Sequence, residues 1–242
     1  MWQFETTVLE VIPRTPDIKT FRLDARGRDD VKYEAGQFFY VTISVDGREA
    51  DHIFSISSSP TETAEKKYLE FTKRITGSDY SRALATMKPG AWARIRGAGG
   101  DFTLPDDGQH LCFLSGGIGI TPFRSMLRYI VDKWLHYDIV LLYGNSTWDN
   151  IPFREELEEI ANLNRGLRVE HVLSGPDVPP WWQGKTGRIT KDIIVELVPD
   201  YRERTFYASG PLPMVRALEE QLMELDIPKS QVRHDYFPGY DD

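Results

Sequence analysis

The chain has 242 residues, of which 40% are hydrophobic and 27% charged, and this composition is typical of globular domains rather than disordered or repetitive proteins. Its net charge of −8 comes with no basic stripe, so nucleic acid is not an expected partner, and no apolar run reaches the roughly 18 residues of a transmembrane helix. The single cysteine, Cys112, excludes an intramolecular disulfide, a cysteine-ligated zinc site and an iron–sulfur cluster carried by this chain.

The N-terminal sequence and the histidines narrow the functional classes further. The segment MWQFETTVLEVIPR lacks a basic region followed by an apolar stretch, so we expect no signal peptide and a cytoplasmic location. The five histidines show no metal-ligand spacing, so no metal site is expected.

The first half of the chain is typical of short β-strands. Segments rich in Val, Ile, Phe, Tyr and Thr are separated by Gly, Pro and Asp, and this spacing predicts an antiparallel barrel or sandwich. One short helix is expected at Ser78–Met87. The predicted strands are Trp2–Ile12, Ile18–Leu23, Phe38–Val45, Phe54–Ser57, Tyr68–Lys73 and Ala91–Arg96.

The second half alternates strands and helices, and this order predicts a parallel sheet with helices on both faces. After its first strand, Thr121-Pro122 have the residue types of a helix N-cap and first helical position, and apolar residues then recur at helical spacing as far as Trp134. The predicted strands are Leu111–Ser115, Asp138–Tyr143, Arg168–Ser174, Thr205–Ser209 and Gln231–Phe237. The later helices are Pro152–Asn162, Thr190–Val198 and one marked by Val215, Leu218, Leu222 and Leu225.

The two halves also differ in charge. Residues 1–105 carry 15 basic and 15 acidic side chains, whereas residues 106–242 carry 14 basic and 22 acidic ones. The turn-rich segment Leu104–Gly108 lies at the change. We therefore predict two domains, residues 1–105 and residues 106–242.

Two glycine-bearing turns follow predicted parallel strands. Gly116–Pro122 and Ser209–Met214 each lead from a strand into a helix, where glycine lets the backbone approach a phosphate and the helix N-terminus supplies N–H groups. Open α/β sheets bind their ligands at this edge. Each turn alone is equally compatible with a tight connection that binds nothing, because neither matches the Rossmann or Walker pattern.

Two segments of the first half carry similar signals. In Asp51–Pro60 an aromatic residue stands beside several serine hydroxyls. This pattern is compatible with a surface on which a ligand stacks beside hydrogen-bond donors, and equally with an edge strand followed by a serine-rich turn. Gly77–Ser81 is a helix start that can receive a phosphate or simply cap the helix.

In their order along the chain, these motifs resemble those of the ferredoxin–NADP reductase superfamily of flavoproteins, and the resemblance runs nearly from end to end. His52–Ser55 resembles the family's Arg-x-Tyr-Ser motif, and Gly77–Ser81 resembles its pyrophosphate loop. Gly116–Pro122 resembles its nicotinamide-nucleotide turn, and Tyr143–Asn145 resembles its second nucleotide loop. Further similar segments are Gly97–Leu104, Gly184–Ile189, Ser209–Met214 and Asp235–Tyr240. The resemblance implies an antiparallel FAD-binding barrel followed by an α/β nucleotide-binding domain.

The resemblance also implies roles for single residues. Ser55 is expected to hydrogen-bond flavin N5, Phe54 to cover one flavin face, and Phe237 to shield the other face until nicotinamide displaces it. Ser55, Ser209 and Phe237 are the residues expected at the reacting centre. The expected FAD and nucleotide contacts are His52, Phe54, Ser55, Lys73, Gly77, Ser78, Ser81, Gly116, Gly117, Gly119, Thr121, Tyr143, Gly144, Asn145, Gly210, Pro211, Met214 and Tyr240. Phe54 and the C-terminal aromatic residues also suit plain packing in a barrel.

Four positions depart from the family's pattern. His52 replaces the Arg that neutralises an FAD phosphate, Phe54 replaces Tyr, and Ser209 replaces a Cys near the nicotinamide. Ser146 stands where many NADP-specific relatives have an Arg, although Arg154 is a possible substitute. The choice between NADH and NADPH therefore stays open.

The resemblance implies an NAD(P)H-dependent flavoprotein reductase that passes electrons from FAD to a separate acceptor. That acceptor is expected to be a small redox protein such as ferredoxin or flavodoxin, or else a membrane or oxygenase component. Two alternatives remain: a flavin- or nucleotide-binding subunit without turnover, and a reductase that releases free reduced flavin. The sequence identifies neither the acceptor nor the oligomeric state.

Overall fold

The computed structural model describes residues 1–105 and 109–237, and the chain divides into two packing units. The first unit comprises Met1–Leu104 and Thr121–Asp132, and the second comprises Pro105–Ile120 and Lys133–Asp242. The helix at residues 121–132, which the sequence assigned to the second domain, thus packs with the first unit.

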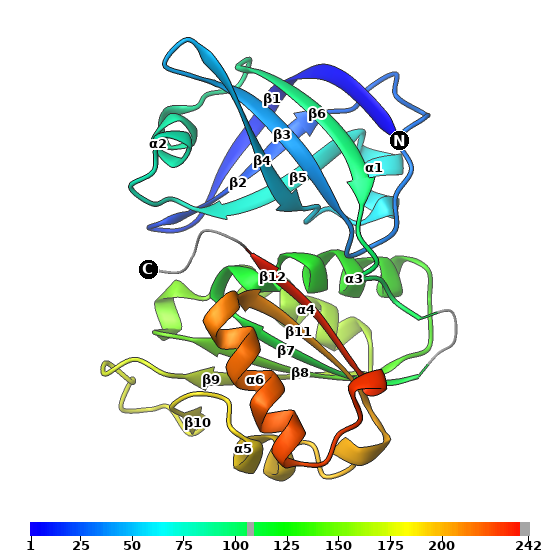
Figure 1. Ribbon diagram of the computed structural model, residues 1–242, viewed down its shortest axis with the longest axis vertical. Helices are drawn as coiled ribbons and strands as arrows, with labels where there is room; N and C mark the ends of the chain where they lie inside the picture. Colours follow the sequence, from blue (N-terminus) through cyan, green and yellow to red (C-terminus); the bar gives the residue numbers. More distant parts are fainter. Residues whose placement is uncertain (106–108, 238–242) are drawn as a thin grey trace. The chain divides into compact units, whose positions relative to one another are not determined.

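The first unit is built on a six-stranded antiparallel sheet with the strand order β4-β3-β6-β1-β2-β5 (Figure 1). Buried and exposed residues alternate along β1 because one face of the sheet covers a core. A backbone hydrogen bond from Ser57 N to Glu70 O (2.8 Å) links the chain after edge strand β4 to edge strand β5 and closes the sheet towards a barrel. The strands are β1 (Trp2–Thr15), β2 (Ile18–Asp24), β3 (Phe38–Val45), β4 (Arg48–Ser55), β5 (Tyr68–Arg74) and β6 (Trp92–Gly99).

Two helices accompany this sheet, α1 (Pro60–Lys66) and α2 (Asp79–Thr86). The sequence predicted α2, which Ser78 caps, but it did not predict α1. Helix α1 begins with a capping box, in which Ser59 accepts from the Glu62 N–H and the Glu62 side chain accepts from the Ser59 N–H. The predicted strand Phe54–Ser57 begins too late, because β4 already begins at Arg48 and pairs with β3 along its whole length. The first residues of β4 are mostly polar and therefore carry no apolar strand signal.

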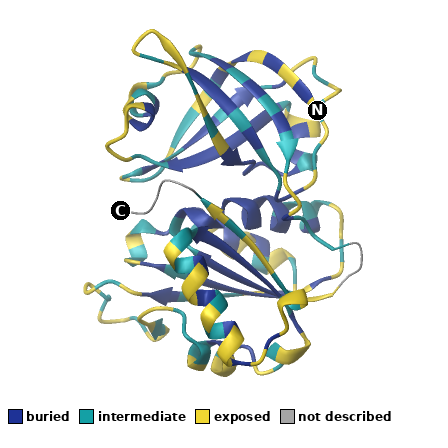
Figure 2. Ribbon diagram, in the orientation of Figure 1, coloured by how far each residue is buried: buried dark blue, intermediate teal, exposed yellow. Residues whose placement is uncertain are grey.

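The second unit contains a six-stranded sheet in the order β10-β9-β8-β7-β11-β12, in which every described pairing is parallel. Its central strands are buried (Figure 2). The predicted architecture, an antiparallel barrel followed by a parallel α/β sheet, is confirmed. The strands are β7 (His110–Gly116), β8 (Asp138–Asn145), β9 (Leu167–Leu173), β10 (Lys185–Thr186), β11 (Thr205–Pro211) and β12 (Val232–Phe237).

Helices connect these strands. Apolar residues of α5 and α6 pack with β7, β8 and β11 in one core cluster. The helices are α3 (Ile120–Asp132), α4 (Arg154–Leu163), α5 (Lys191–Leu197) and α6 (Leu212–Glu224), and four short 3-10 helices are η1 (Gly117–Gly119), η2 (Trp148–Asn150), η3 (Tyr201–Glu203) and η4 (Lys229–Gln231).

The bounds of α3 differ from the prediction at both ends. The 3-10 turn η1 leads directly into the helix at Ile120, so Thr121 lies in the first turn and is not the N-cap. At the other end the helix stops at Asp132, and Trp134 adopts a positive φ of 56° and is 83% exposed. The apolar periodicity therefore extends the predicted helix two residues too far, because a left-handed residue cannot continue an α-helix.

Candidate functional site

The predicted flavin-contacting residues His52, Phe54 and Ser55 lie at the end of β4. The Phe54 ring stacks against Phe71, with the centroids 4.5 Å apart, and against His52, with the centroids 5.0 Å apart. Phe54 is only 8% exposed and belongs to the barrel core, and Ser55 is buried beside it. A flavin that stacks on Phe54 must therefore displace the His52 imidazole, and the predicted contact stays a prediction.

The side chains of His52 and Lys73 both have a lowered pKa. Burial lowers the pKa of His52 below its ordinary value, and the charge of Lys73 lowers it further. Burial also lowers the pKa of Lys73 to about 8. The neighbouring Arg74 is paired with Asp17, so its charge is already balanced. An anion beside His52 and Lys73 would favour both charged forms, which is what a flavin phosphate requires.

The start of α2 provides the predicted pyrophosphate loop. Ser78 Oγ accepts a hydrogen bond from Ser81 N (3.3 Å), and Ser81 Oγ accepts one from Thr76 N (2.9 Å), so both serines already shape the loop. A Cβ on Gly77 would meet no atom within 4 Å. This open space at a helix N-terminus fits a phosphate group.

In the second unit, the turn after β7 brings together predicted residues from several elements. Gly117 has a φ of +51°, which favours glycine. A Cβ on Gly119 would lie 2.7 Å from Gly210 Cα, and one on Gly116 would collide with Met214 Sδ. The turn approaches β11 and α6 so closely that a side chain at either position would clash, so packing alone requires glycine at positions 116 and 119. Tyr143 adds a hydrogen bond from its hydroxyl to Gly117 O (2.8 Å).

Buried polar atoms without a hydrogen-bond partner gather at the carboxyl ends of these strands. They include Ser115 Oγ, Asn145 Nδ2 and Ser209 Oγ, from β7, β8 and β11. Ser115 and Ser209 lie opposite each other in the register of β7 and β11. Because an unsatisfied buried group costs about 1–3 kcal/mol, such atoms are typical of a site that a polar ligand completes. A nicotinamide nucleotide, with its carboxamide and hydroxyls, fits this donor and acceptor set.

The sequence predicted Asn145 and Ser209 but missed Ser115, because a lone serine at a strand end carries no motif signal. It also missed a cluster at the end of β8 and β9. There the His171 ring lies 5.8 Å from Tyr143 and 5.6 Å from Trp148, and neither ring nitrogen has a partner. Burial and the nearby Arg154 charge lower the pKa of His171 to about 4, so the imidazole is neutral.

Three tryptophans complete this cluster. Trp148 lies with its ring centroid 5.3 Å from that of Trp181 and 5.3 Å from that of Trp182, and the Arg154 guanidinium lies 4.4 Å from the Trp148 centroid. The Trp181-Trp182 pair therefore packs against η2.

The remaining predicted residues are spread over the second sheet and α3. Phe237 ends β12 opposite Pro211 of β11, and Gly144 precedes Asn145 in β8. Thr121 is buried in the first turn of α3. Tyr240 lies outside the described residues.

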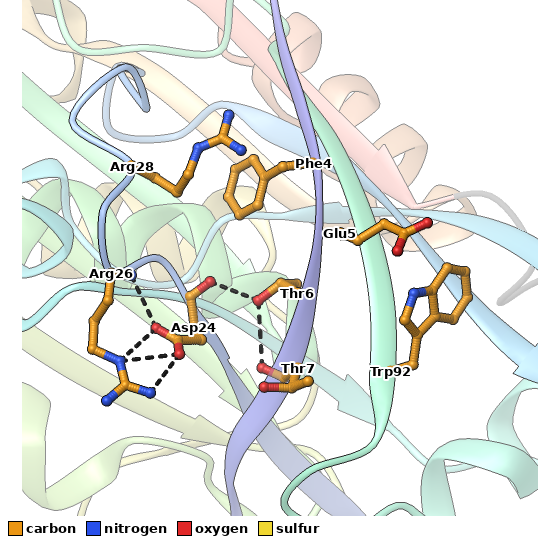
Figure 3. A pocket seen from close by; sticks show the side chains of 8 residues that line it. All are labelled: Phe4, Glu5, Thr6, Thr7, Asp24, Arg26, Arg28 and Trp92. Carbon is orange, nitrogen blue, oxygen red and sulfur yellow. Dashed lines mark hydrogen bonds and ion pairs between the residues drawn. The ribbon is translucent and has the colours of Figure 1, made fainter.

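Two surface cavities contain none of the predicted residues. The one in Figure 3, of about 340 Å³, is lined by Phe4, Glu5, Thr6, Thr7, Asp24, Arg26, Arg28 and Trp92. Its basic groups are engaged, since Arg26 pairs with Asp24 (2.6 Å) and Arg28 with Asp30 (2.8 Å). The other, of about 420 Å³, lies beside α6 and β12 and is lined by Arg216, Glu219, Glu220, Leu222, Met223, Ile227, Lys229, Val232 and His234.

Metal-binding clusters and membrane-spanning helices are both absent from the described residues. No group of three or more His, Cys, Asp or Glu side chains among them could hold a metal ion. Within residues 1–105 and 109–237, no helix is long and apolar enough to cross a membrane.

Comparison with known families assigns each unit. Residues 6–104 match the model of the oxidoreductase FAD-binding domain, and residues 113–220 match that of the oxidoreductase NAD-binding domain. The barrel and the parallel sheet are therefore the two halves of a pyridine-nucleotide-dependent flavoprotein, and FAD and NAD(P) are its cofactors.

Relatives and solved structures agree with this class. The chain is 29% identical to the glycine betaine monooxygenase reductase subunit of Chromohalobacter salexigens, over 88% of this chain and 58% of that protein. It is also 29% identical to ferredoxin–NADP reductase B of Sorangium cellulosum, over 88% of this chain and 84% of that protein. The crystal structure of a cytochrome P450 reductase from Amycolatopsis is similar with a TM-score of 0.83 and 26% identity, over 97% of this chain and 70% of that one.

The chain belongs to the ferredoxin–NADP reductase superfamily, as its motifs predicted. It spans 58% of the length of the glycine betaine monooxygenase reductase subunits that it matches. The comparisons leave the electron acceptor open.

Proposed function

We propose that this chain transfers hydride from NADH or NADPH to FAD and delivers the electrons to a separate acceptor protein. The observation that carries the proposal is the succession of an FAD-binding and an NAD-binding oxidoreductase domain over residues 6–104 and 113–220. Bound FAD accepts two electrons as hydride and can release them singly, so the protein's task is to bind and orient the reactants.

In the barrel, the residues proposed to hold FAD are those around the end of β4 and the start of α2. His52 and Lys73 neutralise the pyrophosphate together with the open turn at Gly77, and Ser55 holds the reactive edge of the flavin. Support comes from the lowered pKa of both His52 and Lys73, since a basic pair that is at least partly buried gains more from a bound anion than an exposed pair does.

In the α/β unit, the residues proposed to hold the nicotinamide nucleotide lie at the carboxyl ends of β7, β8 and β11. Ser115, Asn145 and Ser209 supply the polar contacts, and their unpartnered buried atoms support this assignment. Phe237, at the end of β12, is proposed to shield the flavin until the nicotinamide arrives.

The proposed acceptor is a protein carrying a one-electron centre. Related proteins that are named a monooxygenase reductase subunit and a ferredoxin–NADP reductase point to an iron–sulfur protein or an oxygenase component, and flavodoxin is a further candidate. Anaerobic mixing of the NADH-reduced protein with oxidised ferredoxin, flavodoxin or an oxygenase component tests this part directly. Rapid reoxidation of the flavin by one of them identifies the acceptor class.

Purification tests the enzyme proposal as a whole. The protein, reconstituted with FAD and passed through gel filtration, is expected to stay yellow and to bleach when NADH or NADPH is added without oxygen. Loss of the flavin on the column would favour a reductase of free flavin. A colourless protein that cannot be reconstituted would instead favour a subunit without turnover. That alternative stays open because His52 and Ser209 replace the Arg and Cys of the family's pattern.

A further inference from the structure

A buried ionic cluster joins helix α3 to the rest of the first unit. The Arg124 side chain is 3% exposed, and its Nη2 donates to Glu62 Oε1 at 2.9 Å. Glu70, completely buried on β5, lies 3.9 Å from the same guanidinium and accepts from Arg22 Nε (3.0 Å) and Ser57 Oγ (3.0 Å). Burial alone would raise the pKa of Glu62, but the charge and hydrogen bonds of Arg124 outweigh it and hold that pKa at about 2.

The same helix also binds the backbone that follows β4. Arg124 Nη1 donates to Ser57 O (2.8 Å), and Ser125 Oγ donates to Ser58 O (2.7 Å). At the far end of the helix, Asp132 accepts from Thr61. Ser57 and Ser58 follow Ser55, the last residue of β4, by two and three positions, so α3 is bound to the segment directly after β4.

Helix α3 is at the same time the direct continuation of the nucleotide turn. The 3-10 turn Gly117–Gly119 runs into α3 at Ile120 without an intervening loop. Arg124 comes five residues after Gly119, about 7.5 Å along a helix at 1.5 Å per residue. No loop therefore separates the turn from the residues of α3 that bind the chain after Ser55.

Stability alone gives little reason for such a cluster. Replacing a buried ion pair by packed apolar side chains is often neutral or stabilising, because desolvation offsets the attraction between the charges. A guanidinium fork nevertheless fixes geometry, since it bonds a carboxylate and a carbonyl in set directions. The cluster is thus better suited to fixing the position of α3 than to adding stability.

We propose that Arg124 and Ser125 are positioning residues for hydride transfer, because they bind α3, which begins directly after the nucleotide turn, to the chain after Ser55. The inference rests on the proposed function. In the transfer, the nicotinamide C4–H bond breaks and the flavin N5–H bond forms, so the dinucleotide is oxidised and FAD is reduced by two electrons. Its rate depends steeply on the alignment of the two atoms.

The test compares Ser125→Ala with Thr20→Val in the FAD-loaded protein. Each substitution removes one buried hydroxyl of the first unit, but Ser125 lies in α3, whereas the Thr20 hydroxyl bonds Arg14 Nε (2.9 Å) and Thr72 (2.7 Å) inside the barrel. Flavin reduction by saturating NADH is followed in single turnovers, with and without deuterium at C4, and the dissociation constant of FAD and the rate of reduction by dithionite are measured beside it.

For Ser125→Ala, we expect the saturating rate to fall about fivefold, with the deuterium isotope effect retained and with FAD affinity, half-saturating NADH and dithionite reduction unchanged. Thr20→Val should keep the wild-type rate. Arg124→Lys, which keeps the charge but loses the fork, should lower the rate further. Equal rates for Ser125→Ala and wild type, or equal slowing in Ser125→Ala and Thr20→Val, would overturn the inference. Failure of wild type itself to be reduced would instead overturn the proposed function.

Discussion

At the scale of single residues, Ser55 gives a direct prediction. We expect Ser55→Ala to keep FAD bound but to slow its reduction by one to two decades, because the loss of one hydrogen bond at the reacting atom costs about 1–3 kcal/mol. Single-turnover reduction of the FAD-loaded variant by NADH measures this. An unchanged rate would show that Ser55 does not contact flavin N5.

His52 predicts a pH dependence of FAD binding. Burial and the charge of Lys73 lower the pKa of His52 in the free protein, whereas a bound phosphate favours the imidazolium and raises that pKa in the complex. FAD affinity should therefore be greatest below the free-protein pKa, fall as pH rises towards the pKa of the complex, and level off above it. Lys73, with a pKa of about 8, should add a second decline in alkaline solution.

The dissociation constant of FAD at pH 5, 7 and 9.5 tests this for wild type and His52→Arg. We expect the arginine variant to lose the decline between pH 5 and 7 but to keep the alkaline one. If the two proteins have the same pH profile, His52 does not face the phosphate.

Ser209 predicts opposite effects on stability and on function. Its buried hydroxyl has no partner, so Ser209→Ala should leave the nucleotide-free protein as stable as wild type or about 1 kcal/mol more stable. The same change should slow flavin reduction by NADH if that hydroxyl meets the nicotinamide. Urea unfolding without nucleotide and single-turnover kinetics measure the two effects, and a less stable variant with normal kinetics would contradict this role.

At the scale of elements, we expect the segment from the end of β8 to the start of α4 to set the choice of nucleotide. A 2′-phosphate calls for a bidentate cation, but Ser146 follows Asn145, and Arg154 already lies over Trp148. We therefore expect no strong preference for NADPH. A ratio of kcat/KM values above about a hundredfold in favour of NADPH, roughly 2.7 kcal/mol, would contradict this reading.

The elements also show how far the sequence could be interpreted. Apolar runs and alternation predicted most strands of both sheets, because residues that are buried against a core leave a local apolar pattern. The two-residue strand β10 was missed, and β4 was placed too late. Helix α1 was hidden, because its seven residues contain no apolar stripe and depend on the Ser59–Glu62 capping box. Trp134 was misplaced, because periodicity alone does not show where a helix stops.

Within the candidate site, the residues that belong to sequence motifs could be predicted, but the residues that the fold brings next to them could not. The glycines of the nucleotide turn carry a signal in sequence, and the structure adds that two of them are required by contact with β11 and Met214. Ser115, His171 and Arg124 matter through neighbours that are distant in the chain. Such contacts arise only in the fold, so no local pattern marks them.

At the scale of the whole molecule, the two packing units differ from the two domains predicted from the linker sequence. Residues 121–132 follow the nucleotide turn in the chain but pack with the barrel. The nucleotide turn is therefore followed, without a loop, by a helix of the first unit. We expect hydride transfer between the two cofactors because the chain carries both an FAD-binding and an NAD-binding domain.

The most direct test of that expectation is anaerobic stopped-flow absorbance of the FAD-loaded protein mixed with NADH and, separately, with NADPH. We predict that the visible flavin absorbance is lost in a single-turnover phase that saturates with nucleotide and slows when C4 carries deuterium. Retention of bound, oxidised FAD in the presence of both nucleotides would contradict the account.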